Sequence, residues 1–547
     1  MNRTLTRTLG VIAASALVTA GLHAGIAPAT AAAPVLGTFA KVTEGAGSAV
    51  VGSRLLFVAE TAQHGTELWR TDGTQAGTQL VKDIVPGAQG SDPFHLAKFG
   101  DKALFAATTA ISGRELWVTD GTSAGTMMLK DIAPGAANSD PRDFTVVGNK
   151  VLFTASTVET GRELWVTDGT PAGTTLVKDI QPGFKTSGVT DLVAMGNSVY
   201  FRASDGSTGM ELWKSNGTEA GTVLVKDIIP GGTGGFPKNL LAHGNTLYFA
   251  ASTPAHGDEL WKSDGTEAGT VQVKDIRPGH VGSSPGHLTS VGSTVYFRAS
   301  AHHGIELWKT NGTAAGTVQV KDINPTGDSF PGDLTALGSK LMFRASDGKS
   351  GAELWTSGGT AASTIRVADI RPGANGSSPS QFTQVGSQVV FSADDGTHGN
   401  ELWISNGTAA GTRLLEDIAP GAASGAPRMV GVLGQRVILH STVNGATTLR
   451  AVTIGVETIT LKKPVIKGMP KVGRTLTARA GKPATGVTFK YRWLRNGKPI
   501  KGAKAGKKKY VLVAADRGKR IQVRVKATKK GLPSVTKKSK RTPRIRR

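Results

Sequence analysis

Residues 259–276 read ELWKSDGTEAGTVQVKDI, and closely similar stretches recur along most of the chain. The Glu-Leu-Trp tripeptide occurs eight times at intervals of 47 or 48 residues, with its tryptophans at Trp69, Trp117, Trp165, Trp213, Trp261, Trp308, Trp355 and Trp403. Eight phenylalanines, from Phe57 to Phe391, recur in step with them. This regularity indicates one supersecondary unit that is stacked many times.

Each unit predicts four short antiparallel strands. In residues 240–276 the expected strands are 240–242, 246–252, 259–263 and 270–276, and the turn between the first two contains Gly244-Asn245. Four strands in a period of about 45 residues are typical of a β-propeller blade. Alternation along the third strand places Trp and Leu on opposite faces, so each tryptophan is expected to be a structural wedge between blades.

The two ends of the array predict how it closes. Residues 428–452 repeat the first three strands of the unit, with Leu439 and Leu449 at the Phe and Trp positions. Residues 37–42 loosely resemble the missing fourth strand. We therefore expect an all-β protein with a closed propeller of nine four-stranded blades at 37–455. Eight blades with an additional hairpin is the alternative, and an open solenoid is the third possibility.

The pattern ELWxxDGTxxGTxxVKDI resembles the bacterial ELWxxDGT (hyalin-like) repeat family of exported proteins, over about residues 37–455. That family is defined by its repeat, so the resemblance implies export and no particular reaction. The N-terminus agrees, because residues 1–31 have the basic, apolar and small-x-small regions of a signal peptide. Residues 32–36 would lead into the mature protein, which we expect to be secreted, extracellular or attached to the cell surface, with no membrane span.

The C-terminal part has a different composition. After a linker at 456–463, residues 464–530 resemble a bacterial Ig-like module, with Trp493 as a structural residue in a central strand and no cysteine pair. Residues 531–547 are predicted to be a basic, disordered tail. Residues 461–547 hold 30 Lys and Arg against one acid, Asp516, whereas residues 1–460 have a net charge of −5.

This charge predicts binding to an anionic envelope polymer of the teichoic-acid type through residues 461–547. The candidate contacts are Lys507, Lys508, Lys509, Lys537, Lys538, Lys540, Arg541, Arg546 and Arg547. Nucleic acid has the same chemistry, but an exported protein is not expected to meet it in the cell.

A second candidate site lies in the loops between the second and third strands. One repeat position there is occupied by His64, His256, His303 and His398, and the same loops contain Asp205, Asp347 and Asp395. Such a rim could bind a metal or a glycan or protein ligand. The preferred interpretation is that these residues are exposed loop positions copied by duplication, so no metal or cofactor is predicted.

No catalytic constellation is recognisable. The glutamate of Glu-Leu-Trp recurs in every unit, whereas a catalytic acid needs one asymmetric site. The sequence also has no cysteine, which excludes disulfides and a thiol nucleophile. We therefore expect an exported, non-enzymatic binding or scaffold protein. The alternative is a propeller enzyme that acts on extracellular glycans, or a quinone-cofactor dehydrogenase.

Overall fold

The computed structural model describes residues 33–302, 304–455, 461–481, 483, 487–502, 506–528 and 534–547. Apart from the short 3-10 turns η1 (Ala409–Gly411) and η3 (Ala514–Asp516), the regular elements in these ranges are strands. None of the described residues forms a helix of the length and apolarity that crossing a membrane requires. The predicted signal peptide and residues 456–460 of the predicted linker lie outside the described residues.

The strands of residues 35–453 form nine antiparallel sheets, of which eight have four strands and one has five. The first three sheets are β2 (Lys41–Val42), β3 (Ala49–Val51), β4 (Arg54–Thr61), β5 (Gly65–Thr71) and β6 (Gln79–Lys82); β7 (Phe94–Phe99), β8 (Lys102–Thr109), β9 (Gly113–Thr119) and β10 (Met127–Lys130); and β11 (Arg142–Val147), β12 (Lys150–Thr157), β13 (Gly161–Thr167) and β14 (Thr175–Lys178). The next three are β15 (Thr190–Met195), β16 (Ser198–Ala203), β17 (Glu211–Ser215) and β18 (Val223–Lys226); β19 (Lys238–His243), β20 (Thr246–Thr253), β21 (Gly257–Ser263) and β22 (Val271–Lys274); and β23 (Gly286–Val291), β24 (Thr294–Ala301), β25 (Gly304–Thr310) and β26 (Val318–Lys321). The last three are β27 (Gly332–Leu337), β28 (Lys340–Ser346), β29 (Ala352–Ser357) and β30 (Ile365–Ala368); β31 (Ser380–Val385), β32 (Gln388–Asp394), β33 (Asn400–Ser405) and β34 (Arg413–Glu416); and β35 (Arg428–Leu433), β36 (Arg436–Val443), β37 (Ala446–Thr453) and β1 (Val35–Phe39). The predicted all-β class and the four-stranded unit are confirmed.

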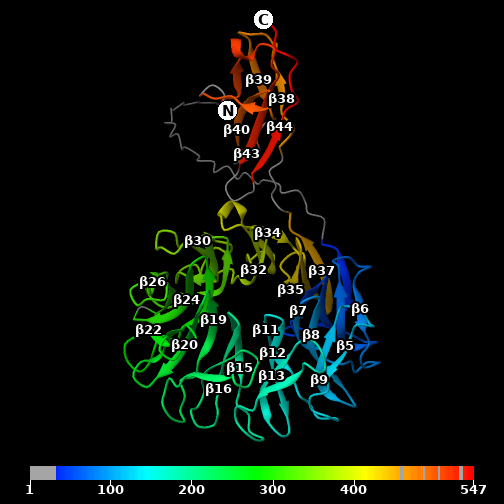
Figure 1. Ribbon diagram of the computed structural model, residues 1–547, viewed down its shortest axis with the longest axis vertical. Coiled ribbons are helices and arrows are strands. Elements are labelled where there is room, and N and C mark those ends of the chain that lie inside the picture. Colours follow the sequence, from blue (N-terminus) through cyan, green and yellow to red (C-terminus); the bar gives the residue numbers. More distant parts are fainter. Residues whose placement is uncertain are drawn as a thin grey trace, which may run out of the picture. The chain divides into compact units, whose positions relative to one another are not determined.

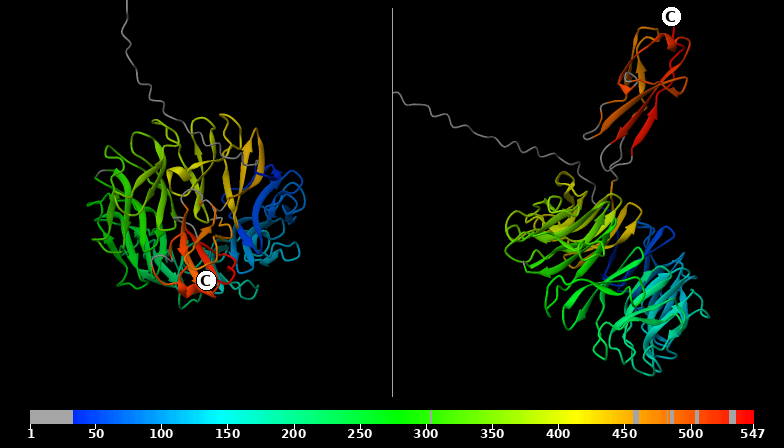
Figure 2. Two further views of the ribbon diagram at one scale, coloured as in Figure 1. Left: turned by 90° about the horizontal axis from the view of Figure 1, so that it is seen from above. Right: turned by 60° about the vertical axis from the view of Figure 1, so that its left-hand side comes forward.

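The last sheet is completed by the first strand of the chain. Its strand order is β1-β37-β36-β35, and Gly37 and Thr38 of β1 pair with Leu449 and Thr448 of β37. Figures 1 and 2 show the sheets following one another in chain order, with the blue first sheet beside the yellow-orange last one. The predicted pairing of the N-terminal strand with the last hairpin is therefore present.

The core of this part lies between the sheets. Nine clusters of buried apolar side chains each join two neighbouring sheets, and one of them joins the last sheet to the first. Trp213 packs on Leu152 and Leu164 of the preceding sheet, while Leu212 packs on Leu247 and Phe249 of the following one. Seven of the eight repeat tryptophans are only 5–9% exposed. Trp69 is half-buried against Phe39, so all eight repeat tryptophans pack between sheets.

Polar contacts add to this apolar packing at two repeat positions. The buried carboxylate of Glu163 accepts hydrogen bonds from the Ile180 and Ser187 backbone N–H groups (3.1 and 2.9 Å) and from Ser187 Oγ (2.7 Å), which fastens the segment leading to the next sheet. Lys178 Nζ donates to the carbonyl of Thr222 in the next sheet, at 3.1 Å. Arg436 of the last sheet donates likewise to the Asp72 carbonyl of the first sheet, at 3.1 Å.

Residues 461–547 form two further sheets. One contains β38 (Val465–Lys467), β39 (Thr475–Arg479) and β42 (Lys509–Val511); the other contains β41 (Lys498–Pro499), β40 (Thr488–Arg495), β43 (Ile521–Thr528) and β44 (Val535–Lys538). Trp493 is fully buried, stacks on Tyr510 and donates from Nε1 to the Lys507 carbonyl at 2.9 Å.

The prediction of a disordered tail at 531–547 is wrong for residues 534–547, which the structure describes. These residues form β44 and bridges to Lys471 and Arg517, and Ile545 is only 2% exposed. The physical reason is spacing: the small or apolar side chains of Ser539, Thr542 and Ile545 face inward between basic residues that face solvent. A count of charges does not reveal this pattern.

Candidate functional site

The histidines predicted for the rim each pair within their own unit and do not converge on one site. The loops between second and third strands bridge to the connections between sheets at Thr66–Gly90, Asp258–Gly282 and Ala352–Gly376. Each described histidine of the rim is near a carboxylate of its own unit: His64 Nδ1 is 2.7 Å from Asp83, His398 Nδ1 is 2.7 Å from Asp395, and His256 Nε2 is 3.8 Å from Asp275. His303 lies outside the described residues.

The rim aspartates hold turns. Asp205 accepts from the backbone N–H groups of Ser207 and Thr208 at 2.8 and 2.9 Å, and although burial opposes it, this hydrogen bonding lowers the pKa of Asp205 to about 2. Asp347 and Asp395 accept in the same way from residues three positions further on. Among the described residues, no group of three or more His, Asp or Glu side chains is placed to hold a metal ion.

The first strands of the sheets carry a feature that the sequence analysis missed. Seven of them, β7 to β31, have a non-glycine residue with positive φ as their second residue: His95, Asp143, Asp191, Asn239, His287, Asp333 and Gln381. Such backbone conformations are costly and cluster at functional sites. Each lies at a register shift against the second strand, as in a β-bulge. The sequence signal was a polar residue recurring at this repeat position.

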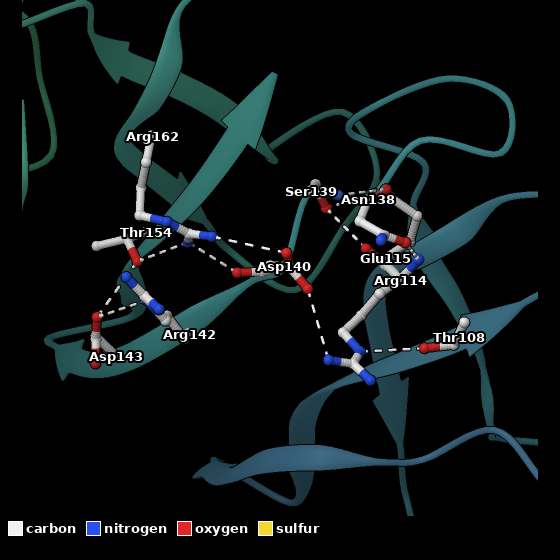
Figure 3. Close-up of polar contacts among 10 residues, drawn as sticks. All are labelled: Thr108, Arg114, Glu115, Asn138, Ser139, Asp140, Arg142, Asp143, Thr154 and Arg162. Carbon is white, nitrogen blue, oxygen red and sulfur yellow. Dashed lines mark hydrogen bonds and ion pairs between the residues drawn. The ribbon is translucent and has the colours of Figure 1, made fainter. Parts of the chain in front are cut away.

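Three arginines gather at two of these neighbouring sheets (Figure 3). Arg114 Nη1 lies 3.6 Å from Asp140 Oδ1, Arg162 Nη1 donates to the Asp140 carbonyl at 2.9 Å, and Arg142 Nε lies 3.7 Å from Asp143 Oδ2. With three guanidinium groups and two carboxylates, the cluster has a net charge of +1. Asp140 is shared by Arg114 and Arg162, and Asp143 pairs with Arg142, so the cluster is largely satisfied by its own ion pairs.

A pocket lined by several unlike polar groups lies where the first and last sheets meet. A pocket of about 330 Å³ is lined by Val42, Thr43, Glu44, Gly45, Gly47, Ser48, Phe57, Val58, Gln381, Arg428, Met429, Val430 and His440. Glu44 Oε1 lies 3.5 Å from Arg428 Nε and 3.9 Å from His440 Nε2. Unlike polar groups from three different sheets therefore converge on one concave surface.

His440 is the most constrained of these groups. It is 7% exposed, and burial lowers the pKa of its imidazole, which favours the neutral ring. Its Nδ1 is buried and has no hydrogen-bond partner among the described residues. In three other sheets the corresponding position of the second strand is an arginine (Arg202, Arg298 and Arg344), and in none of the other sheets is it a histidine. The pocket thus breaks the symmetry of the repeat, and repeat-based reasoning overlooked it.

The third candidate surface belongs to residues 461–547. Every lysine and arginine in the described part of this segment is exposed except Arg495, which is half-buried; the candidate contacts from Lys507 to Arg547 are among the exposed ones. The one acid, Asp516, is fully buried and accepts from Arg495 Nε at 2.7 Å and from the Tyr510 hydroxyl at 2.9 Å. Burial and the hydrogen bond to Asp516 raise the pKa of Tyr510 to about 12. The exposed charge of the described residues here is therefore entirely positive.

Comparison with known proteins identifies no family for this chain. No protein-family model matches the chain. No curated protein matches it either. Among solved structures, it is similar to puromycin hydrolase (13% identity, TM-score 0.34), covering 66% of this chain and 61% of that one. A puromycin-hydrolysing peptidase of Mycobacterium tuberculosis gives 12% identity and a TM-score of 0.38, with 74% and 57% covered. The β-propeller domain of the trilobed protease of Pyrococcus furiosus gives 11% and 0.31, with 58% and 95% covered.

These matches correct the predicted function. We expected a non-enzymatic binding or scaffold protein, but the similar structures include several peptidases, which contradicts that exclusion and agrees better with the propeller-enzyme alternative. The chain spans only 61% and 57% of the two puromycin-hydrolysing enzymes, and at these identities and TM-scores the likeness describes sheet architecture and transfers no reaction.

Proposed function

We propose that this chain is an exported protein of the ELWxxDGT-repeat kind, held on anionic envelope polymers by a basic C-terminal domain. In this proposal residues 35–453 form a closed nine-bladed propeller, supported by the nine sheets, the β1–β37 pairing and the apolar cluster that joins the last sheet to the first. The two sheets of residues 461–547, packed around Trp493, form the Ig-like domain.

One observation carries the polymer-binding function: the exposed charge of the described C-terminal residues has a single sign. Asp516 is buried and paired, so it does not offset the exposed lysines and arginines around it. A surface of this kind attracts polyanions by neutralising phosphates and releasing their counterions, which gives strong affinity with little shape selectivity. Teichoic-acid-like polymers have the required dense phosphate charge.

The experiment compares two triple charge reversals in the full chain. Lys507→Glu, Lys508→Glu and Lys509→Glu together should weaken binding to teichoic acid, measured by co-sedimentation at low salt. The matched control reverses three exposed lysines of the propeller, Lys98, Lys102 and Lys340, with the same change in net charge. We expect binding by the control to remain close to that of the unaltered chain.

Salt provides the second measurement. Binding by the unaltered chain should fall steeply as salt is raised from about 50 to 500 mM, and heparin should compete. If affinity does not depend on salt, or if both triple variants lose binding equally, the basic C-terminal surface is not the attachment site.

A second candidate function is a propeller enzyme acting on extracellular glycans. The observation that favours it is the asymmetric pocket where Glu44, Arg428 and His440 converge, since an enzyme requires unlike polar groups around one site. Glu44 and His440 would be its acid–base pair. Turnover of extracellular glycans that is lost in Glu44→Gln would support this candidate, and activity that persists in this variant would exclude it.

A further inference from the structure

We infer that the pocket between the first and last sheets binds a small uncharged saccharide or similar polyol through Glu44, Arg428, Gln381 and His440. This inference names the ligand class for the second candidate function and rests on the same pocket.

The size of the pocket limits the ligand. A volume of about 330 Å³ is near the lower end of the roughly 300–1,000 Å³ range of small-molecule sites. It suits one or two sugar residues, or the end of a longer glycan.

The charge balance favours an uncharged ligand. Glu44 and Arg428 are 3.5 Å apart and offset one another, and the buried imidazole of His440 faces the same carboxylate. An anion would meet Glu44 and a cation would meet Arg428, so neither gains a net electrostatic attraction. A neutral ligand can use both groups without separating the pair.

The hydrogen-bonding groups favour hydroxyls. Glu44 offers acceptor oxygens and Arg428 offers donors. Gln381 has its Oε1 engaged with the Met429 backbone N–H at 3.1 Å, which leaves its amide N–H groups as donors. His440 lines the pocket, and its Nε2 lies 3.9 Å from Glu44 Oε1. A hydroxyl donates and accepts at once, so neighbouring hydroxyls match this mixed set. Val42, Phe57 and Met429 supply apolar wall for the C–H face of a sugar ring.

The pocket wall is held in place by contacts outside it. The segment from Thr43 to Ser48 is fixed at one side by a hydrogen bond from the Leu96 N–H to the Ala46 carbonyl (2.8 Å) and at the other by Ser48 Oγ, which donates to the Val430 carbonyl (2.7 Å). Gly47 has φ of 80°, and a Cβ there would lie 2.8 Å from the Leu96 carbonyl oxygen. A pre-formed wall reduces the ordering cost of binding.

The test uses the full chain and measures binding by titration calorimetry and ligand-observed NMR. The panel contains neutral mono- and disaccharides and N-acetylated sugars, with glucuronic acid as the anionic probe and glycine as the zwitterionic probe. High salt suppresses the proposed polyanion binding, so the result is independent of the C-terminal domain. Because binding and not turnover is measured, failure of the enzyme candidate is distinguishable from failure of this inference.

We expect at least one neutral saccharide to bind the unaltered chain, and Glu44→Gln and His440→Ala to weaken its affinity tenfold or more. Glu44 is 60% exposed, so Glu44→Gln keeps the test valid even if His440→Ala does not fold. The matched control is Arg344→Ala, at the position equivalent to His440 in another sheet, which should leave affinity unchanged. Absence of binding across the neutral panel, preference for a charged probe, or equal loss in the control would overturn the inference.

Discussion

At the scale of single residues, the glutamate of the eight Glu-Leu-Trp tripeptides has the same structural role in each of these units. Its carboxylate is removed from water, yet it is surrounded by backbone N–H groups and a serine hydroxyl, as Glu163 illustrates. Burial raises the pKa of Glu163 and of Glu211 to about 7, against the partial opposition of these hydrogen bonds. The same structural role recurs at Glu115, Glu259, Glu306 and Glu353.

The raised pKa values of Glu163 and Glu211 predict that the free energy of unfolding falls as the pH rises. An acid whose pKa is raised in the folded state holds its proton more tightly there than in the unfolded chain. Between about pH 4.5 and 7 the folded chain therefore binds more protons, and stability is lost as the pH rises through this window. The urea midpoint of unfolding should be higher at pH 5.5 than at pH 8, and Glu163→Gln should reduce this difference. A midpoint that rises over the same interval would contradict the assignment.

The wedge tryptophans give a second prediction at this scale. Trp213→Ala should destabilise the folded chain by about 3–5 kcal/mol, as expected for truncation of a large buried side chain. Asn216→Asp, in the exposed turn of the same sheet, should change stability by no more than about 0.5 kcal/mol. Denaturant unfolding of both variants checks the comparison, and equal effects would show that Trp213 is not a packing wedge.

At the scale of elements, β1 connects the start of the chain to its last sheet. Leu36 and Phe39 enter the apolar cluster between the last and first sheets, where the Phe39 ring lies edge-on to Trp69 with centroids 5.0 Å apart. Pairing with β37 gives the backbone of β1 its hydrogen-bond partners, and Leu36 and Phe39 give the strand its apolar packing.

We therefore expect Phe39→Ala to destabilise the propeller by about 3–5 kcal/mol. Val35→Ala is the control on the same strand, because Val35 is 40% exposed and its truncation should have an effect within about 0.5 kcal/mol. The two variants are compared by the midpoint of denaturant unfolding. Similar midpoints for both would mean that β1 adds little to the stability of the last sheet.

At the scale of the whole molecule, the sequence predicted the strands of the repeat and the pairing of its two ends, but not the pocket between those ends. The strands and the buried tryptophans follow from a pattern that eight units share, and the β1–β37 pairing follows from the incomplete unit at 428–452. Glu44 and His440 belong to the two atypical ends of the array, and only the fold brings them together. The positive-φ residues of the first strands were missed because a local backbone conformation leaves little trace in composition, and Ile545 was missed because basic neighbours surround it.

The pairing of β1 with β37 also affects the order in which the strands can pair during synthesis. Among the strands of the nine sheets, β1 is synthesised first and β37 last, so Thr38 is made about four hundred residues before its partner Thr448. During that wait the eight intervening sheets can assemble from neighbours in sequence, whereas the outer edge of β37 has no partner until its own chain doubles back. The strand of these sheets that is made first, β1, is thus the last to find its partner. A nascent chain at high concentration meets identical β1 strands on its neighbours before its own returns, which makes crowding during synthesis the hazard of this architecture.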